Sequence, residues 1–418
     1  MLIEFSVSNF RSFREKETFS MVAAPRLHRR GNVFSPEVVG EKLPDLLKVA
    51  AIYGPNASGK SNLLMALNIV PTMVQTSPAN LVPVKPFRFD KNLAHSPSVF
   101  EYHFINNKIR YQFNFSATSN RIFEERLIFF PDGKAVTLYD RKYSEECGEE
   151  YVFSEKLEGG SELHQIWTRL TNPTTLFLAQ AVANSSEEIK QLSFPFQWLK
   201  NKLFIVGTKM EYLANSGKNL VKDNPVFAQE IASFLQEIDV PVTSVRTEFI
   251  SEEPLNNLLA SINSEPTSKN KKSTSSTTTF THRTALGDAE FDYDEQSEGT
   301  KNLFGFYLPW GLIENDTEFF SVMGIDELDS SLHPEIVANL IERFLKRAKV
   351  TQLIFTTHDT HLMDTKLLRR DQIWLTERDM NGATKLRSVY EFEGRESEDI
   401  EKRYFEGRYR SLPNLRKG

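Results

Sequence analysis

The 418-residue sequence contains one cysteine, Cys147, which excludes an internal disulfide and any metal site built from cysteines. It has no apolar run of about 18 residues or more, so no membrane-spanning helix and no membrane partner are expected. Arg11 and Arg14 interrupt the stretch that a secretory leader would need to keep apolar, which excludes a signal peptide. These absences favour a cytoplasmic protein.

Positive charge is also in the minority, with 50 Lys and Arg against 56 Asp and Glu and a net charge of −6. This balance argues against attraction of the whole surface to nucleic acid. Basic residues cluster in three segments, 26–30, 269–272 and 408–417, which we interpret as solvated surface. Contact of these segments with DNA stays open. The fractions of hydrophobic (40%) and charged (25%) residues are those of a globular protein.

Alternation and apolar runs predict the elements of the N-terminal half. A strand is expected at 2–10, and an almost wholly apolar strand at 46–53 is expected to be buried on both faces. A helix is expected at 62–70. Residues 83–130 alternate aromatic and β-branched with polar positions between Asn and Ser turns, which predicts an antiparallel β lobe.

Helical patterning follows from about residue 155 to 260, with helices expected at 186–203 and 227–238. The segment 264–281, SEPTSKNKKSTSSTTTFT, is rich in Ser, Thr and Lys and carries few apolar residues that could stabilise a fold. We therefore expect a mobile loop or the tip of an insertion there.

The remaining sequence returns to an α/β pattern. A helix is expected at 299–313, a strand at 319–325 and a helix from Pro334, a residue suited to a first helical position. Strands are expected at 351–355 and 372–375. The whole pattern predicts an α/β core whose two halves are separated in the sequence by inserted strands and helices.

The segment 54–61 reads GPNASGKS and matches G-x-x-x-x-G-K-[ST]. Its two glycines let the backbone wrap around phosphate oxygens, and loop N–H groups donate to them at the start of the next helix. The lysine places a positive charge at the β and γ phosphates, and the last serine can ligate Mg²⁺. The sequence therefore predicts a site for ATP and Mg²⁺. Its loop residues are Gly54, Pro55, Asn56, Ala57, Ser58, Gly59, Lys60 and Ser61.

A second motif, SVMGIDELDSSLHP, places two carboxylates at the end of an apolar strand. Asp326 is expected to join Ser61 in the magnesium shell, and Glu327 to act as the catalytic base that deprotonates the attacking water. An Asp-Glu pair at a strand end is common on its own. Its place after a phosphate loop favours the catalytic interpretation.

Two further motifs follow the same logic. His358 ends the apolar strand in QLIFTTHDTH and is expected to contact the γ-phosphate as a catalytic residue, whereas His333 and His361 have no clear role. Ser297 and Gly299 open the helix expected at 299–313, where an N-cap serine and a nearby glycine can present N–H donors to phosphate.

In this order, the four motifs resemble those of ABC-type ATPases, and the soluble RecF/SMC/Rad50-like branch more than the transporters. More narrowly, the chain resembles the AAA-family ATPases of phage-defence loci in the overcoming-lysogenization-defect, RloA and AbiL group, and it is similar to the PARIS-system ATPase. The resemblance rests on these segments: PNASGKSNLLMAL, VKPFRFD, TNPTTLFLAQA, IDELDSSLHP, FTTHDTHLMD, DQIWLTERDMNGATKL and EKRYFEGRYRSLPNL.

The resemblance implies an α/β fold, an ABC-type P-loop ATPase core in two sequence halves with an antiparallel β lobe and a mostly helical insertion. It implies a homodimer or larger even-numbered homo-oligomer that sandwiches two nucleotides. Ser297 and Gly299 would then act on the nucleotide of the partner copy, and residues 329–332 would lie across the dimer seam. No glutamine loop can be placed, because Gln112 falls inside an expected strand.

The related overcoming-lysogenization proteins carry a Toprim nuclease domain after the ATPase, but too few residues follow His358 for such a domain here. The Asp-x-Asp of residues 292–294 follows no apolar strand. The resemblance therefore implies a separate effector protein, a Toprim-like nuclease. The expected divisions are 1–155, the first half of the core with the β lobe; 156–290, the helical insertion ending in a flexible loop; 291–395, the second half; and 396–418, a tail.

Three hypotheses about function remain. The first is an ATPase that acts as sensor or scaffold of an anti-phage system and controls the separate effector. The second is a RecF/Rad50-like ATPase of DNA repair or recombination, which the net charge disfavours. The third is a nucleotide-clamped interaction module without hydrolysis, which Glu327 and His358 argue against.

Overall fold

The structure is a computed structural model that describes residues 1–75, 81–186, 188–207, 211–250, 275–314, 319–396, 398–409 and 411–412. The chain forms two compact units. The first consists of Met1–Thr208, Asp316–Asp329 and Val337–Gly418, and the second of Lys209–Asn315 and Ser330–Ile336. This division follows the compactness of the folded chain, whereas the boundaries expected at residues 155, 290 and 395 divide the sequence by its pattern. The two cannot be compared directly, so the expected boundaries stay a prediction.

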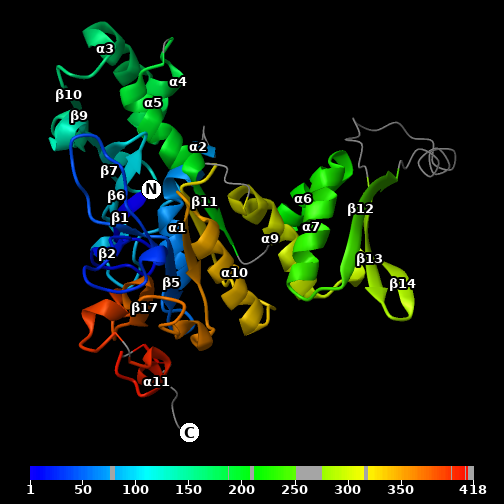
Figure 1. The fold of residues 1–418 in the computed structure, drawn as a ribbon. Helices are drawn as coiled ribbons and strands as arrows, with labels where there is room; N and C mark the ends of the chain where they lie inside the picture. The colour runs from blue at the N-terminus through cyan, green and yellow to red at the C-terminus, as the bar shows by residue number, and fades with distance from the viewer. Residues whose placement is uncertain are drawn as a thin grey trace. The chain divides into compact units, whose positions relative to one another are not determined.

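A six-stranded sheet in the first unit runs in the order β11-β15-β16-β5-β17-β18, with all neighbours parallel except the edge strand β18. Figure 1 labels its strands β5, β11 and β17. Every residue of β5, β15 and β16 is buried, as the apolar runs predicted. The carboxyl ends of these three neighbouring strands meet at one edge, where α/β sheets bind ligands. The bounds are β5 Val49–Tyr53, β11 Leu203–Val206, β15 Val322–Ile325, β16 Gln352–Thr356, β17 Ile373–Arg378 and β18 Thr384–Ser388.

The predicted antiparallel β lobe is a seven-stranded sheet in the order β10-β9-β8-β7-β6-β1-β2. It is larger than expected, because the N-terminal strands β1 and β2 join it and two strands follow residue 130. Buried and exposed positions alternate along β6 and β8, which explains the alternation in the sequence. The bounds are β1 Leu2–Ser8, β2 Glu17–Ser20, β6 Ser98–Asn106, β7 Ile109–Ala117, β8 Ile122–Phe130, β9 Val136–Ser144 and β10 Gly148–Phe153.

The other elements of the first unit are mostly short helices, and the structure shows why two expected elements are divided. The helix expected at 62–70 starts earlier, at Lys60, and breaks at Asn68, whose ψ of 8° leaves the helical range. The strand expected at 46–53 is interrupted at Lys48, and its first two residues pair with β3 instead. The bounds are β3 Val33–Phe34, β4 Leu46–Leu47, α1 Lys60–Leu67, α2 Ile69–Gln75, α3 Gly160–Leu170, α4 Phe177–Ala183, α5 Lys190–Gln197, a π-helix at Trp198–Lys202 and α11 Ile400–Phe405. The helix α10, Pro334–Arg347, belongs to the first unit from Val337 onward.

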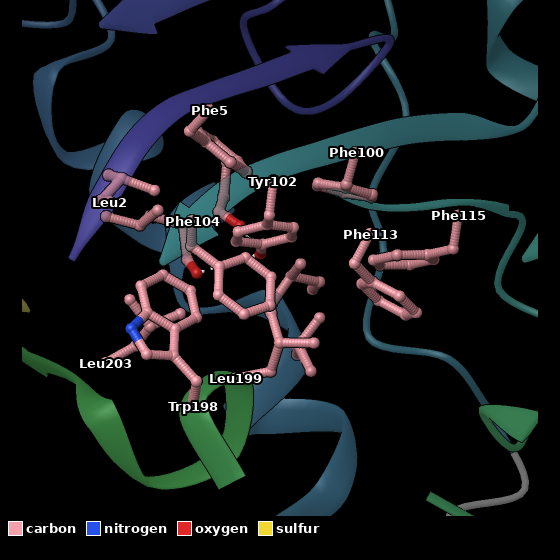
Figure 2. Packing of buried hydrophobic residues seen from close by; sticks show 14 of the residues in the cluster. Leu2, Phe5, Phe100, Tyr102, Phe104, Phe113, Phe115, Trp198, Leu199 and Leu203 are labelled. Carbon is pink, nitrogen blue, oxygen red and sulfur yellow. Dashed lines mark hydrogen bonds between the residues drawn. The ribbon is translucent and has the colours of Figure 1, made fainter. Parts of the chain in front are cut away.

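One hydrophobic core joins the β lobe to α1. Figure 2 shows the part of it in which residues of the β lobe pack against the π-helix. The Phe104 ring stacks on Trp198 of the π-helix at 4.1 Å between centroids. The buried Tyr102 hydroxyl hydrogen-bonds to the carbonyls of Ala66 (3.2 Å) and Leu67 (3.0 Å), which closes the end of α1. The helix that follows the phosphate loop is therefore fixed to the seven-stranded sheet.

The described residues of the second unit include the helices α6, α7 and α9 and a three-stranded antiparallel sheet in the order β12-β13-β14. The prediction of a mobile loop at 264–281 is wrong from Ser275 onward, because β13 begins there; residues 264–274 lie outside the described residues. The threonines of this tract are β-branched and pair well, and Thr278 and Thr247 hydrogen-bond across the strands at 3.0 Å. The bounds are α6 Glu211–Asp223, α7 Pro225–Glu237, β12 Val242–Ile250, β13 Ser275–Thr284, β14 Gly287–Asp292 and α9 Glu298–Glu314.

Where the structure describes it, the segment 156–290 therefore contains the strands β11, β12 and β13 and most of β14 besides its helices. The helix expected at 186–203 begins at Lys190, continues as the π-helix and gives way to β11 at Leu203. The strand expected at 319–325 starts at Val322. In the ranges that the structure describes, no helix has the length and apolar character needed to cross a bilayer.

Candidate nucleotide-binding site

The phosphate loop connects β5 to α1 and needs glycine at both ends. Gly54 has φ 151°, and a Cβ there would lie 2.2 Å from Thr376 Oγ1. Gly59 has φ 109°, and a Cβ there would lie 2.1 Å from Thr384 Oγ1. Ala57 also has a positive φ, of 61°. The loop is therefore wound tightly against β17 and β18, in a conformation that most residues resist.

Hydroxyl groups hold this loop in place. Ser58 Oγ lies 2.5 Å from Thr376 Oγ1, and Thr384 Oγ1 lies 2.7 Å from the Ser58 carbonyl oxygen. Thr384 Oγ1 also lies 2.7 Å from Ser12 Oγ, which accepts a hydrogen bond from Asn62 Nδ2 at 2.8 Å. These contacts tie β17, β18, the loop after β1 and the start of α1 into one frame.

Lys60 is the first residue of α1 and is only 6% exposed. Its ammonium group donates to the carbonyl oxygens of Gly54 at 2.9 Å and Pro55 at 3.3 Å. The lysine thus lies folded back across the loop, with its charge next to the loop backbone. A phosphate group in the loop would meet this charge directly.

Ser61, Asp326 and Thr356 converge at the carboxyl edge of the sheet. Asp326 Oδ1 accepts hydrogen bonds from Ser61 Oγ at 3.0 Å and from Thr356 Oγ1 at 2.7 Å. Asp326 is 9% exposed, so its carboxylate is directed by the two hydroxyls more than by solvent. The structure therefore brings together the two residues that the sequence predicted as magnesium ligands.

The hard oxygen donors of Ser61 and Asp326 fit Mg²⁺. Within the described ranges, no group of three or more His, Cys, Asp and Glu side chains could hold a metal ion by itself. A magnesium ion would thus need phosphate oxygens and water to complete its shell, which is how Mg²⁺ binds in nucleotide sites.

Glu327 has a left-handed backbone, with φ 55°. Non-glycine residues avoid this conformation, and strain of this kind concentrates at functional sites. Two hydrogen bonds hold it: the Glu327 N–H donates to Thr356 Oγ1 at 2.7 Å and the Leu328 N–H to the Thr356 carbonyl at 3.1 Å. The neighbouring strand thus fixes the backbone that carries the Glu327 carboxylate.

His358 follows β16 and is exposed. The His358 N–H donates to Asp329 Oδ2 at 3.2 Å. This hydrogen bond joins the loop after β16 to the loop after β15.

Negative charge also gathers near the end of β5. Burial, reinforced by the carboxylates of Asp359, Asp329 and Glu401, raises the pKa of Tyr53 well above its usual value. The side of the site around His358 is therefore rich in negative charge.

The surroundings of Lys60 are also rich in negative charge. Burial lowers the pKa of Lys60, and the nearby carboxylates of Asp326, Glu327 and Asp329 act in the opposite direction. The charges of three carboxylates thus act on one ammonium group. A triphosphate, itself strongly anionic, would be repelled by these carboxylates unless a divalent cation accompanied it.

Ser297 and Gly299 belong to the second unit and start α9. The Ser297 hydroxyl accepts a hydrogen bond from the Thr300 N–H at 3.1 Å, so the predicted N-cap is present. A Cβ on Gly299 would lie 2.6 Å from the Ser331 carbonyl oxygen. The glycine therefore has a packing role in the first turn of α9, and the exposed serine stands at the N-terminus of a 17-residue helix.

The remaining residues raised by the sequence lie away from these contacts. Gln112 lies within β7 and donates to Glu101 at 3.0 Å, as expected of a strand residue. His361 pairs with Asp359, and His333 Nδ1 accepts the Glu335 N–H.

Sequence reasoning missed the three threonines that support the site. Thr356 precedes His358 in the TTH of its strand end, and a hydroxyl there was the available signal. Thr376 and Thr384 lie far from the loop in sequence, and no local pattern marks them.

A Gly-rich loop after a central parallel strand, with Lys and Ser opening the next helix and an Asp at the end of a parallel strand one position beyond the neighbouring strand, defines a protein with the P-loop ATPase fold. Residues 49–364 match the family model described as AAA domain, putative AbiEii toxin, Type IV TA system. The match spans most of the chain, so the chain belongs to this family and carries an ATPase domain of the AAA type. A search of curated proteins gives no match.

Solved SMC head domains are similar over most of their length. The SMC head domain from Thermotoga maritima has 16% identity and a TM-score of 0.40, covering 93% of this chain and 98% of that chain. The Smc head bound to the C-winged helix domain of ScpA has 14% identity and a TM-score of 0.47, covering 93% and 97%. The Smc head with an extended coiled coil bound to the C-terminal domain of ScpA, from Pyrococcus furiosus, has 13% identity and a TM-score of 0.41, with the same coverage.

Proposed function

We propose that the chain binds and hydrolyses ATP with Mg²⁺ between two copies of itself, as the cytoplasmic sensor or scaffold of an anti-phage system that controls a separate effector. The observation that carries the ATPase part is the convergence of Lys60, Ser61, Asp326 and Glu327 at one edge of the sheet. The family description, which names an AbiEii toxin and toxin–antitoxin systems, supports the defence part.

Each residue then has a distinct task. The N–H groups of the loop and the Lys60 ammonium bind the β and γ phosphates. Ser61 and Asp326 would hold a magnesium ion, which would supply positive charge to the phosphate oxygens. Glu327, on its strained and fixed backbone, orients the attacking water and accepts its proton. His358 contacts the γ-phosphate and keeps the water in line with the leaving oxygen.

The second copy completes the site in this proposal. Ser297 and Gly299 at the N-terminus of α9 would face the γ-phosphate held by the partner, where the N-terminal end of the helix favours negative charge. The Glu298 and Gly299 N–H groups would donate to that phosphate, and so would the Ser297 hydroxyl, which keeps its O–H donor while it accepts from the Thr300 N–H.

Subunit mixing tests this arrangement. We expect the Lys60→Ala and Ser297→Arg proteins to be inactive alone. Mixed and exchanged in equal amounts, they should recover about one quarter of wild-type ATP turnover, because half of the dimers are hybrids and each hybrid has one intact site of two. Turnover is measured as phosphate release.

A mixture of Lys60→Ala with Glu327→Gln is the matched control. Both defects then fall on the loop side of the site, so no hybrid site is intact and no turnover should return. Recovery in neither mixture, with hybrid formation shown by differently tagged copies, contradicts a site shared between subunits.

Phage challenge tests the biological role. Cells that carry the native locus should resist a phage that plates on cells without it. Either Lys60→Ala in this chain or deletion of the adjacent gene should remove the protection, because the ATPase and its effector would act together. The adjacent gene product should also co-purify with this chain.

The repair hypothesis makes the opposite prediction. ATP turnover stimulated strongly by DNA at physiological salt, with no change in phage plating, would contradict the defence role and favour the RecF/Rad50-like alternative. It would leave the assignment of the ATPase residues intact.

A further inference from the structure

Phe89 is 73% exposed, the most exposed aromatic side chain in the part of the chain that the structure describes. Its ring meets that of the buried Phe87 at 5.6 Å between centroids and 62° between planes. The guanidinium carbon of Arg378 lies 5.9 Å from the Phe89 centroid. The Phe89 ring therefore packs against Phe87 and Arg378 and still exposes a large apolar area to solvent.

The turn between β17 and β18 is shaped around this ring. Gly382 in that turn has φ 79°, and a Cβ there would lie 3.2 Å from both Phe89 Cε2 and Arg378 Nη2. The Asp379 carboxylate accepts two backbone N–H groups of the same turn, each at 2.8 Å. The positive φ of Gly382 and the two hydrogen bonds to Asp379 thus hold the turn close to the Phe89 ring.

The segment that carries Phe89 is also anchored on its other side. The Phe87 N–H donates to Asn9 Oδ1 at 3.0 Å, and the Arg11 N–H donates to the Lys85 carbonyl at 2.7 Å. Segment 85–89 is therefore held to the loop after β1. A large solvent-exposed ring on such a fixed support loses little side-chain freedom when a ligand covers it.

The same turn leads directly to the phosphate loop. Thr384 follows Gly382 by two residues, and its hydroxyl lies 2.7 Å from the Ser58 carbonyl oxygen. Two residues of chain span at most about 7 Å, and Gly382 and Thr384 approach Phe89 and Gly59 respectively, so the Phe89 ring lies within roughly 15 Å of Gly59. A nucleotide whose phosphates lie in the loop carries its base to one side by a comparable reach, the length of its ribose and α-phosphate.

We propose that Phe89, with Arg378 beside it, binds the nucleobase of the nucleotide held by the phosphate loop. The base stacks on the ring, and the guanidinium group, which lies over the ring, adds positive charge beside the stacked base. The inference rests on the proposed binding of a nucleoside triphosphate by residues 54–61 and adds the subsite for its base.

The test compares two ligands that differ in the base. We measure dissociation constants of Mg²⁺-ATP and of Mg²⁺-bound inorganic tripolyphosphate for the wild type and Phe89→Ala. Loss of a base stack should weaken ATP binding about tenfold. Tripolyphosphate has no base, so its binding should change less than twofold. Phe89→Trp should bind ATP like the wild type, and Phe405→Ala, which removes another exposed ring, is the matched control.

Three results would overturn the proposal. Unchanged ATP binding by Phe89→Ala, or equal weakening of ATP and tripolyphosphate, removes the base subsite and leaves the phosphate loop as proposed. A wild-type protein that binds neither ligand overturns the nucleotide site itself, and the base subsite with it.

Discussion

The Glu327→Gln protein is expected to bind Mg²⁺-ATP as tightly as the wild type and to hydrolyse it at least about 100-fold more slowly, since general base catalysis contributes that much or more. The substitution keeps the shape of the side chain and removes its ability to accept a proton. The backbone bond from residue 327 to Thr356 does not involve the side chain, so the fold of the strand end should persist.

Phosphate release under single-turnover conditions gives the chemical step, and titration with a fluorescent ATP analogue gives binding. Glu342→Gln is the control, because that exposed carboxylate pairs with Lys346 on α10. Hydrolysis by Glu327→Gln at the wild-type rate would remove Glu327 from the catalytic role and leave binding by the loop untouched.

Lys60→Ala is expected to weaken ATP binding at least about 100-fold, because a partly buried charge that meets a phosphate directly is worth several kcal/mol. The remaining charges near this position are the carboxylates of Asp326, Glu327 and Asp329, which repel the nucleotide. Hydrolysis should fall with binding.

Thermal unfolding offers an independent readout. A ligand that binds only the folded state raises the midpoint as its concentration exceeds the dissociation constant. Mg²⁺-ATP should therefore stabilise the wild type and Glu327→Gln but not Lys60→Ala. Lys42→Ala, at an exposed lysine of the same unit, should respond like the wild type. Stabilisation of Lys60→Ala equal to that of the wild type would place the nucleotide elsewhere.

Local signals predicted the parts of this molecule that depend on neighbouring residues. The glycines and lysine of the loop, the apolar strands before residues 54, 326 and 358, and the proline that starts α10 are all visible within short windows. The convergence of Ser61 and Asp326 follows from the parallel order of β5, β16 and β15. The expected helix at 299–313 is α9, with its cap at Ser297.

Long-range contacts could not be predicted in this way. Thr376 and Thr384 touch the loop across more than 300 positions of sequence, and only the sheet brings them there. The polar threonines of β13 predicted a loop, because polar residues bury little apolar area. They form a strand because their β-branched side chains favour extended backbone when β13 pairs with β12. The place of β1 and β2 in the β lobe likewise follows from strand pairing.

Phosphate release from ATP by the purified wild-type chain, with Mg²⁺ and again with EDTA, tests the central claim most directly. The carboxylates around Lys60 and the pairing of Ser61 with Asp326 predict steady release with Mg²⁺. Chelation should reduce the rate at least about 100-fold, because Mg²⁺ supplies charge that the site lacks. Release that persists unchanged in EDTA, or that Lys60→Ala sustains at the wild-type rate, would contradict hydrolysis at this loop.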